Sequence, residues 1–390
     1  MTRPLLNRAL AGMGTTIFAE MSALAVETGS INLGQGFPDT DGPAEVAAAA
    51  AEAVLTGRGN QYPPGPGIPE LRQAIAGHQK RFYGIDLDPD TEVLVTAGAT
   101  EAVAAALLAL LEPGDEVIAL EPYYDSYAAC IAMAGARRVP VTLRAPDFRP
   151  DLDALRDAVT DRTRLILLNS PHNPTGMVAT RAELAEIARL ATERDLLVVT
   201  DEVYEHIVFD GEHIPLATLP GMRERTVTIS SAGKTFSFTG WKIGWVTAPP
   251  ELVSAVRTAK QFLTYVSGGP FQYAIAAGLA LPDSFYADLS AGLRRKRDLL
   301  AAGLSAAGFG VFAPQGTYFI TTDISGLTGA DGLDFCRRLP HVCGVVAVPN
   351  AVFYDDKAAG RSQVRFAFCK RDEQLAAAAD RLRHATWPAS

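Results

Sequence analysis

The stretch TEVLVTAGATEAVAAALLALLEPGDEVIAL, residues 91–120, decides the fold class. It begins with a β-branched, apolar run at residues 91–96 and continues with strong helix formers at residues 101–111. After a Pro-Gly turn, the apolar run returns at residues 116–120. This order predicts a strand, a helix and a second strand, which together form a βαβ unit of a parallel sheet.

The same alternation continues along the chain. Helical patterns occupy residues 127–135, 151–159 and 181–195, and strand patterns occupy residues 137–143, 164–169, 196–200 and 225–231. Strands that alternate with helices of this length favour a parallel sheet with helices on both faces. We therefore predict an α/β fold for this part of the protein.

Beyond residue 280 the pattern changes. A long charged helix is predicted at residues 283–308, and short strand patterns follow, for example at residues 317–322 and 363–368. This mixture is typical of a smaller α+β domain. We expect an N-terminal arm that forms part of the small domain (1–45), a large domain (46–280) and a small C-terminal domain (281–390).

Composition excludes several classes of protein. The 390 residues are 48% hydrophobic and 20% charged, with a net charge of −9 and no long block of like charges, which argues against disorder and against nucleic acid as a partner. The four cysteines form no CxxC pair and no metal-type spacing with the six histidines, so no metal site is predicted. No signal peptide or membrane-spanning run is evident, and we expect a cytoplasmic protein.

Ligands of open parallel sheets bind beyond the carboxyl ends of the strands. Gly98, Ala99 and Thr100 follow the strand at residues 91–96 and begin a helix, where backbone N–H groups suit a phosphate. An ordinary tight turn is the alternative.

Amides and a carboxylate follow the next two strands in the same way. Asn169 ends the strand pattern of residues 164–169, and Asn173 lies four residues further on in a Pro-stiffened turn. The two amides could orient a ring substituent or a carboxylate, or could simply be turn residues. Asp201 and Tyr204 follow residues 196–200. Asp201 could pair with a protonated ring nitrogen or could cap a helix.

The segment SAGKTFSFTGWKIGW, residues 231–245, carries the strongest chemical signal. Lys234 lies between small residues and precedes Phe236, Phe238 and Trp241, and apolar surroundings lower the pKa of an ammonium. Such a lysine forms a Schiff base with an aldehyde. Lys242, near Ser231, is a second cation suited to a phosphate, and a lysine on a surface loop is the plain alternative for Lys234.

Arg365 interrupts the apolar strand pattern of residues 363–368. Its planar guanidinium suits bidentate binding of a substrate carboxylate, and an internal ion pair is the alternative.

Ordered motifs extend over nearly the whole chain. They are NLGQGFPD (32–39), NQYPPGPG (60–67), GATEA (98–102), EPYYDSY (121–127), NSPHNPTG (169–176), DEVYEH (201–206), SAGKTFSFTGWKIGW (231–245) and VRFAFCK (364–370). In these motifs the chain resembles the class I/II aminotransferases of pyridoxal phosphate (PLP) fold type I. It looks most like the kynurenine, glutamine and methionine aminotransferase branch, and it is also similar to actinobacterial N-succinyldiaminopimelate aminotransferases.

The resemblance implies a mostly parallel, seven-stranded sheet and a large domain that binds PLP. It assigns Lys234 the covalent link to the cofactor and Asp201 the pyridinium nitrogen. Tyr204 and Asn173 would hold the phenolic oxygen, and Asn169 would lie beside the ring. The remaining cofactor contacts would be made by Gly98, Ala99, Thr100, Ser231 and Lys242 around the phosphate and by Tyr124 on the ring face, with Tyr123 as the alternative stacking residue.

The resemblance also implies a substrate site and a partner. Arg365, Asn173 and the backbone of Gly36 would bind the substrate carboxylate. Phe18 stands where the branch often has Trp, so the pocket for the substrate side chain would differ. Tyr62 would reach the phosphate of a neighbouring subunit, which implies a homodimer with shared active sites.

The activity implied is ping-pong transfer of an amino group from an L-α-amino acid to a 2-oxo acid. Phe18, Tyr62, Tyr123 and Phe271 suggest an aromatic pocket for methionine, glutamine, kynurenine or phenylalanine. N-succinyldiaminopimelate is the alternative donor and needs a second carboxylate site. A cysteine-S-conjugate β-lyase activity could share the site. A PLP-binding regulator is a remote alternative, because it would need an N-terminal winged helix and the resemblance begins within the first twenty residues.

Overall fold

The computed structural model describes residues 5–11, 13–14 and 16–387. Residues 1–4, 12 and 15 of the predicted N-terminal arm, and residues 388–390 of the predicted C-terminal domain, lie outside the described residues. Within the described part of the chain, no helix has the length and apolar character needed to cross a membrane.

The predicted βαβ stretch is present as β2 (Val93–Thr96), α4 (Gly98–Leu110) and β3 (Glu116–Glu121). These strands belong to a seven-stranded sheet with the order β2-β8-β7-β6-β5-β3-β4. The other members are β4 (Arg137–Thr142), β5 (Thr163–Asn169), β6 (Leu197–Asp201), β7 (Thr226–Ser231) and β8 (Gly244–Thr247). Strands β2 and β3 are therefore not neighbours, and α4 packs against the strands that lie between them.

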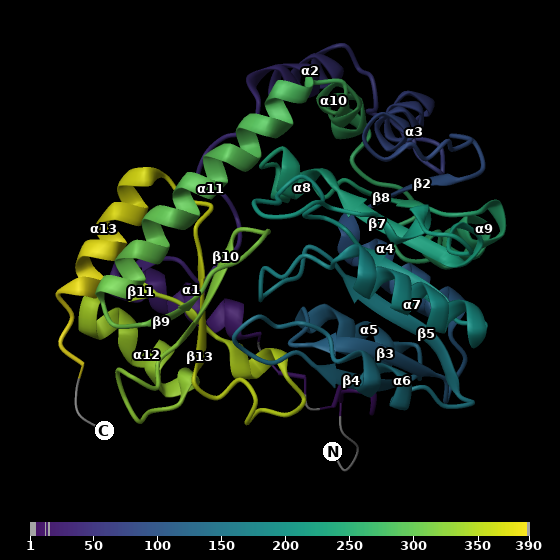
Figure 1. Cartoon of the computed structure of the whole chain (residues 1–390). Coiled ribbons are helices and arrows are strands. Elements are labelled where there is room, and N and C mark those ends of the chain that lie inside the picture. Colours follow the sequence, from purple (N-terminus) through teal and green to yellow (C-terminus); the bar gives the residue numbers. More distant parts are fainter. Residues whose placement is uncertain (1–4, 12, 15, 388–390) are drawn as a thin grey trace.

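The sheet is mostly parallel, as predicted. Strands β4, β3, β5, β6 and β7 pair in parallel, whereas β8 is antiparallel to both of its neighbours, β7 and β2. The sequence did not predict β8, because its first two residues, Gly244 and Trp245, form the end of the segment read as a site motif. The fold is that of the α/β class (Figure 1).

Alternate residues of the central strands face opposite sides of the sheet. Val117 and Leu165 pack with α4, α5 (Asp125–Met133) and α9 (Pro250–Lys260). Ile118 and Ile166 pack with α6 (Leu152–Asp157) and α7 (Arg181–Glu193) on the other side. Because both faces are covered, the strands read as continuous apolar runs rather than as alternating ones.

A third apolar cluster covers the β2 edge of the sheet. It includes residues of α2 (Ala44–Leu55), α3 (Pro69–Tyr83) and α10 (Gly269–Leu279). Short helices connect the strands elsewhere: η1 (Leu216–Thr218), η2 (Arg223–Arg225), α8 (Ala232–Thr235), η3 (Thr239–Trp241) and η4 (Asn350–Phe353).

The C-terminal part forms a four-stranded antiparallel sheet with the order β12-β13-β10-β9. Its elements are α11 (Asp283–Ala306), β9 (Gly310–Phe312), β10 (Phe319–Asp323), α12 (Gly332–Cys343), β11 (Val345–Val346), β12 (Val348–Pro349), β13 (Gln363–Ala367) and α13 (Asp372–Arg383). From the N-terminal part, α1 (Ile17–Thr28) packs on α12, and β1 (Ile31–Asn32) pairs in parallel with β11. Figure 1 shows this body beside the seven-stranded sheet.

Candidate active site

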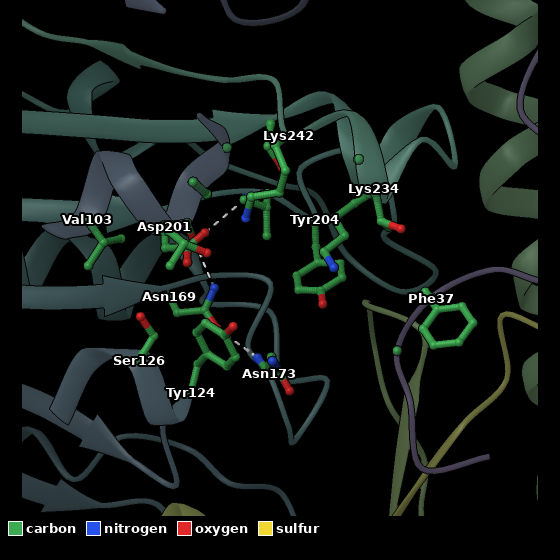
Figure 2. Close-up of a pocket in the computed structure, with 18 of the residues that line it drawn as sticks. Phe37, Val103, Tyr124, Ser126, Asn169, Asn173, Asp201, Tyr204, Lys234 and Lys242 are labelled. Atoms are coloured by element: carbon green, nitrogen blue, oxygen red, sulfur yellow. Dashed lines mark hydrogen bonds between the residues drawn. The ribbon is translucent and has the colours of Figure 1, made fainter. Parts of the chain in front are cut away.

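The cavity lies beyond the carboxyl ends of the parallel strands, facing the C-terminal sheet. It has a volume of about 440 Å³. It brings together the following predicted residues: Phe18, Gly36, Gly98, Ala99, Thr100, Tyr124, Asn169, Asn173, Asp201, Tyr204, Ser231, Lys234, Lys242 and Arg365. In Figure 2, Asp201, Asn169 and Tyr124 lie on one side of the cavity and Phe37 on the other, with Lys234 and Tyr204 between them.

Lys234 lies in the short helix α8, directly after β7. Burial lowers the pKa of its ammonium, as predicted. Its Nζ lies 5.8 Å from the ring centre of Tyr204 and 5.6 Å from that of Tyr318. The sequence did not identify Tyr318, which directly precedes β10 and lies more than 80 positions away in the chain.

The aromatic residues expected to surround this lysine pack elsewhere. Phe236 stacks on Phe285, and Phe238 stacks on Trp241 with ring centres 3.8 Å apart. The prediction of a desolvated lysine is therefore correct, but the flanking rings are packed in the cluster at the β2 edge instead.

Asp201 ends β6 and is only 6% exposed. Burial raises the pKa of its carboxyl, and the Tyr127 hydroxyl opposes that rise by donating a 2.6 Å hydrogen bond to Oδ2. The Val203 amide donates to Oδ1 at 3.3 Å. Tyr127 was missed, although it lies three residues beyond Tyr124 and therefore on the same face of a helix.

The two asparagines connect β6 to the C-terminal sheet. Asn169 Nδ2 donates to the backbone carbonyl of Asp201 at 2.8 Å, and Asn169 Oδ1 accepts from the backbone N–H of Asn173 at 2.8 Å (Figure 2). Asn173 Oδ1 in turn accepts from Arg365 Nη1 at 2.9 Å. The turn thus holds Asn173 where it contacts both parts of the site.

Arg365 lies in β13 and is 1% exposed. Nη2 donates to the Gly34 carbonyl at 3.0 Å, the guanidinium lies 3.9 Å from the Phe319 ring centre, and Nε has no partner among the described residues. Burial lowers its pKa to about 10. Its hydrogen-bond partners in the described chain are neutral oxygens, so the internal ion pair considered as an alternative is not what holds it.

The N-terminus of α4 forms a cup. Its cap residue, Ala97, has no capping side chain, and Gly98 has a φ of +74°. A Cβ on Gly98 would lie 3.2 Å from Lys242 Nζ, so glycine lets this lysine approach the helix. Lys242 itself has a φ of +54°. A helix N-terminus with an adjacent ammonium suits a phosphate.

The loop at residues 34–37 closes the other side. A Cβ on Gly36 would lie 2.4 Å from the Phe319 ring, and the Gly36 carbonyl accepts a 2.5 Å hydrogen bond from the Tyr318 hydroxyl. Gln35 and Phe37 also line the cavity and were missed, although both belong to a motif quoted from the sequence.

Three aromatic residues expected in the pocket lie outside it. Tyr123 is buried and its hydroxyl donates to Asp355 at 2.6 Å, whereas Tyr124 lines the cavity. Phe271 stacks on Trp241. Tyr62 is 82% exposed. Within the described chain, the expected aromatic wall therefore reduces to Phe18, which is joined by the unpredicted Phe37 and Phe319.

The site offers an amine with a lowered pKa, a buried carboxylate, a phosphate cup and a buried guanidinium. Together with the sheet, these groups define a transferase of amino groups built on PLP fold type I. The chain belongs to the aminotransferase class I and II family, whose family model matches residues 28–382. Members of this family and fold depend in general on PLP.

Similar proteins extend over almost the whole chain. A probable N-succinyldiaminopimelate aminotransferase of Mycobacterium tuberculosis is 55% identical over 94% of this chain and 95% of its own length. The methionine aminotransferase of Escherichia coli is 41% identical over 95% of this chain and 96% of its own. The solved structure of the M. tuberculosis N-succinyldiaminopimelate aminotransferase has a TM-score of 0.94 at 54% identity, covering 97% of this chain and 99% of that one.

Proposed function

We propose that this aminotransferase uses PLP and moves the amino group of an L-α-amino acid with a neutral side chain to a 2-oxo acid. Donors of the methionine, glutamine, kynurenine or aromatic type fit this description. The reaction is ping-pong, because one site serves both half-reactions.

The residues present fit PLP. Lys234 would bond to its aldehyde carbon, the Asp201 carboxylate would meet the ring nitrogen, and the α4 N-terminus with Lys242 would hold the phosphate. The buried Asp201 supports this assignment, because its described hydrogen-bond donors, Tyr127 and Val203, are neutral and a cation would offset its burial.

The bound cofactor supplies an aldehyde that accepts the amino group and a ring that accepts electrons. Lys234 Nζ, once freed by the incoming amine, would take the proton from the substrate Cα. Asp201 would keep a proton on the ring nitrogen. Arg365 and Asn173 would hold the substrate carboxylate and so orient the Cα–H bond.

The charged residues that line the cavity favour an amino donor with a neutral side chain. Among the described residues that line it, the cations are Lys234, Lys242 and Arg365. In this proposal Lys234 binds the aldehyde, Lys242 the phosphate and Arg365 the α-carboxylate. No lining cation of the described chain is left for a second carboxylate, and Phe18, Phe37 and Phe319 offer apolar surface to a side chain.

N-succinyldiaminopimelate is the second candidate donor. It is favoured by the 55% identity to the M. tuberculosis protein described as a probable aminotransferase of that substrate. In this case a cation from a second subunit would have to complete the site.

We also propose a homodimer with shared active sites. Tyr62 and Tyr265 are 82% and 51% exposed and contact each other edge to face, with ring centres 5.7 Å apart. Phe262, nearby in sequence, is 81% exposed. Aromatic residues gathered on a surface are typical of an interface, and Tyr62 is the residue expected to reach the partner's phosphate cup.

Borohydride reduction of the PLP-loaded protein, followed by peptide mapping, tests the cofactor assignment. We expect one labelled peptide, carrying the reduced adduct on Lys234, and no label in Lys234→Ala. Lys260→Ala serves as the control, because that lysine is buried and lies outside the cavity. Label on another lysine would contradict the assignment.

A panel of amino donors tests the substrate class. Single half-reactions are followed by the cofactor spectrum with methionine, glutamine, kynurenine, phenylalanine and N-succinyldiaminopimelate. We expect a higher kcat/KM for neutral donors. A preference for N-succinyldiaminopimelate would replace the first candidate by the second, and pyruvate release from a cysteine conjugate without an oxo acid would reveal β-lyase activity.

A further inference from the structure

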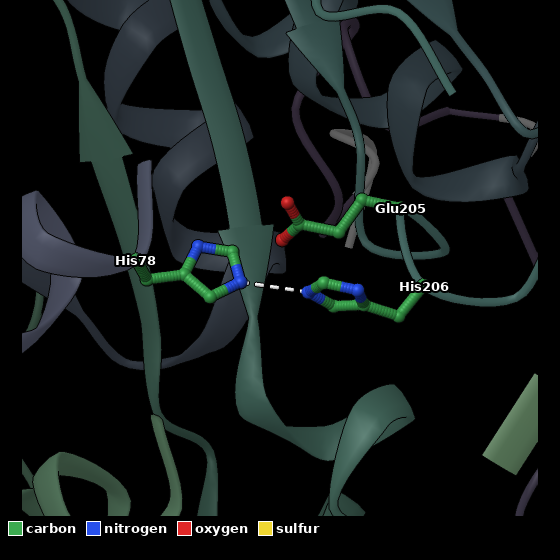
Figure 3. A group of neighbouring side chains, drawn as sticks. All are labelled: His78, Glu205 and His206. Carbon is green, nitrogen blue, oxygen red and sulfur yellow. Dashed lines mark hydrogen bonds between the residues drawn. The ribbon is translucent and has the colours of Figure 1, made fainter. Parts of the chain in front are cut away.

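A buried cluster of two histidines and a glutamate lies outside the active-site cavity. His78 belongs to α3, and Glu205 and His206 follow β6. The Nε2 atoms of the two histidines are 2.7 Å apart. One oxygen of Glu205 and one ring nitrogen of each histidine all lie within 4.8 Å of one another. Figure 3 shows the two rings and the carboxylate pointing toward a common centre.

The carboxylate of this cluster is buried and accepts a hydrogen bond from a neutral group. Glu205 is 5% exposed, and its described hydrogen-bond donor, the Ser230 hydroxyl at 2.5 Å, is neutral. A buried carboxylate with a neutral hydrogen-bond donor is stabilised by a cation beside it.

The surroundings suit an ion held by nitrogen and oxygen. The rings of Phe82 and Tyr286 lie 4.7 and 4.3 Å from that of His206, centre to centre, and form an apolar shell. His206 is only half-buried, so solvent can reach the cluster from its side. An apolar shell with one open side strengthens binding and leaves a position for water.

We propose that His78, Glu205 and His206 bind one divalent transition-metal ion, of which Zn²⁺ is the best match. Two imidazole nitrogens and one carboxylate oxygen are a recognised three-ligand set for zinc, with water as the fourth ligand. Zinc–nitrogen bonds of about 2.0–2.1 Å place two tetrahedral ligands roughly 3.3 Å apart. The two nitrogens would therefore separate by roughly 0.6 Å, and the proton between them would move to Nδ1 of its own ring, so that both rings bind as neutral imidazoles.

The ion would have a structural role. Glu205 and His206 directly follow Tyr204, and His78 lies on a helix that packs at the β2 edge of the sheet. Bound metal would connect α3 to the segment after β6 that carries the active-site residue Tyr204. This proposal does not depend on the cofactor or on the amino donor.

Equilibrium dialysis of the full-length protein tests the site, after chelation and in phosphate-free buffer. We expect one Zn²⁺ per chain, visible d–d absorption when Co²⁺ replaces it, and a higher thermal midpoint with Zn²⁺ than without. The variants His206→Asn and Glu205→Gln, which keep a polar group of similar size, should bind Zn²⁺ at least tenfold more weakly and lose the Co²⁺ bands. His384→Asn, at an exposed position, is the control and should bind as wild type does.

Three results would overturn the proposal. They are no Zn²⁺ bound by the wild-type protein, equal affinity in wild type and both cluster variants, and loss of binding in His384→Asn instead. If one variant fails to fold, as judged by circular dichroism, the other and the wild-type Co²⁺ spectrum still decide. If the wild-type protein binds no Zn²⁺, the two histidines are joined by a hydrogen bond alone.

Discussion

At the scale of single residues, Asp201 shows how burial and one neighbour set the properties of a carboxylate. The protein removes it from water and provides the Tyr127 hydroxyl as its closest donor. We expect Asp201→Asn to leave PLP bound and to slow turnover by at least a hundredfold, about 3 kcal/mol in activation free energy. Stopped-flow half-reactions measure this change. A rate within about threefold of wild type would contradict the role of Asp201.

Tyr127→Phe provides the graded comparison. The substitution removes only the hydrogen bond that Tyr127 donates to Asp201. In the wild-type protein this hydrogen bond lowers the pKa of Asp201. We expect a loss of activity smaller than that of Asp201→Asn. Because the pKa of Asp201 should rise further without the hydroxyl, spectral titration of the loaded variant should show its acid-side transition at higher pH than in wild type. Coincident transitions would mean that Tyr127 has no effect on the carboxyl.

Arg365 is a buried cation whose described partners leave Nε open. We expect Arg365→Ala to raise the KM for the amino donor by roughly tenfold to a hundredfold, since a charge-assisted hydrogen bond contributes about 1.5–3 kcal/mol. Arg365→Lys should recover only part of the lost affinity for the donor, because lysine lacks the planar guanidinium that binds both oxygens of a carboxylate. Steady-state kinetics with the preferred donor decides, and an unchanged KM in Arg365→Ala would exclude carboxylate binding here.

His172, in the turn between the two site asparagines, gives a pH prediction. Burial lowers its pKa from 6.5 to about 4 in the folded protein. Between pH 6.5 and 4 the unfolded chain binds more protons than the folded protein does. The stabilisation that comes from keeping His172 uncharged is therefore complete above about pH 6.5 and declines as the pH falls toward 4. We expect the loss between pH 6.5 and 5 to be about 2 kcal/mol larger in wild type than in His172→Gln. Urea unfolding at both pH values measures it, and equal losses would show that His172 does not titrate in this range.

At the scale of elements, strand β13 and the residues just beyond it hold both ends of the substrate pocket. Arg365 lies within the strand, and the buried Lys370 donates to the Phe37 carbonyl at 2.7 Å while its ammonium lies 4.1 Å from the Phe37 ring centre. This lysine thus fixes the loop that carries Phe37 into the cavity.

We therefore expect Lys370→Met to loosen this loop. The KM for apolar donors should rise several-fold while kcat changes little, because Lys370 does not line the cavity. Lys296→Met, on α11, is a control for loss of a partly buried lysine. The kcat and KM of both variants, with methionine as donor, test the idea, and a fall in kcat alone would assign Lys370 a different role.

The elements themselves were largely predictable. Strand β5 was predicted at residues 164–169 and is Thr163–Asn169, because its buried residues 165–168 give an uninterrupted apolar run. Strand β8 was not predicted, since four residues that begin with glycine carry too little pattern to separate them from the loop before them. The position of β2 beside β8 rather than β3 was also beyond the sequence, because it depends on pairing across the sheet.

At the scale of the whole molecule, the exposed aromatic group of Tyr62, Phe262 and Tyr265 leads to a prediction of assembly. We expect a dimer in sedimentation at micromolar concentration and a marked shift toward monomer in a Phe262→Asp variant. The monomeric fraction should also bind PLP more weakly, since Tyr62 would then be missing from the partner's cup. A wild-type monomer with full PLP affinity would refute shared sites. The division into residues 1–45, 46–280 and 281–390 stays a prediction.

The sequence by itself determined the fold class and the identity of most of the polar groups in the cavity, though not of Gln35, Ser126, Tyr127 and Thr239. It could do so because parallel strands end at one edge, so that Asn169, Asp201 and Ser231 are brought together by their position after strands alone. Only the tertiary structure decided which neighbours each group has. It placed Tyr127 on Asp201, left Arg365 without an anion in the described chain, and joined His78 to His206 across 128 positions. Such contacts depend on how helices pack against the sheet, and no local pattern of residues encodes that packing.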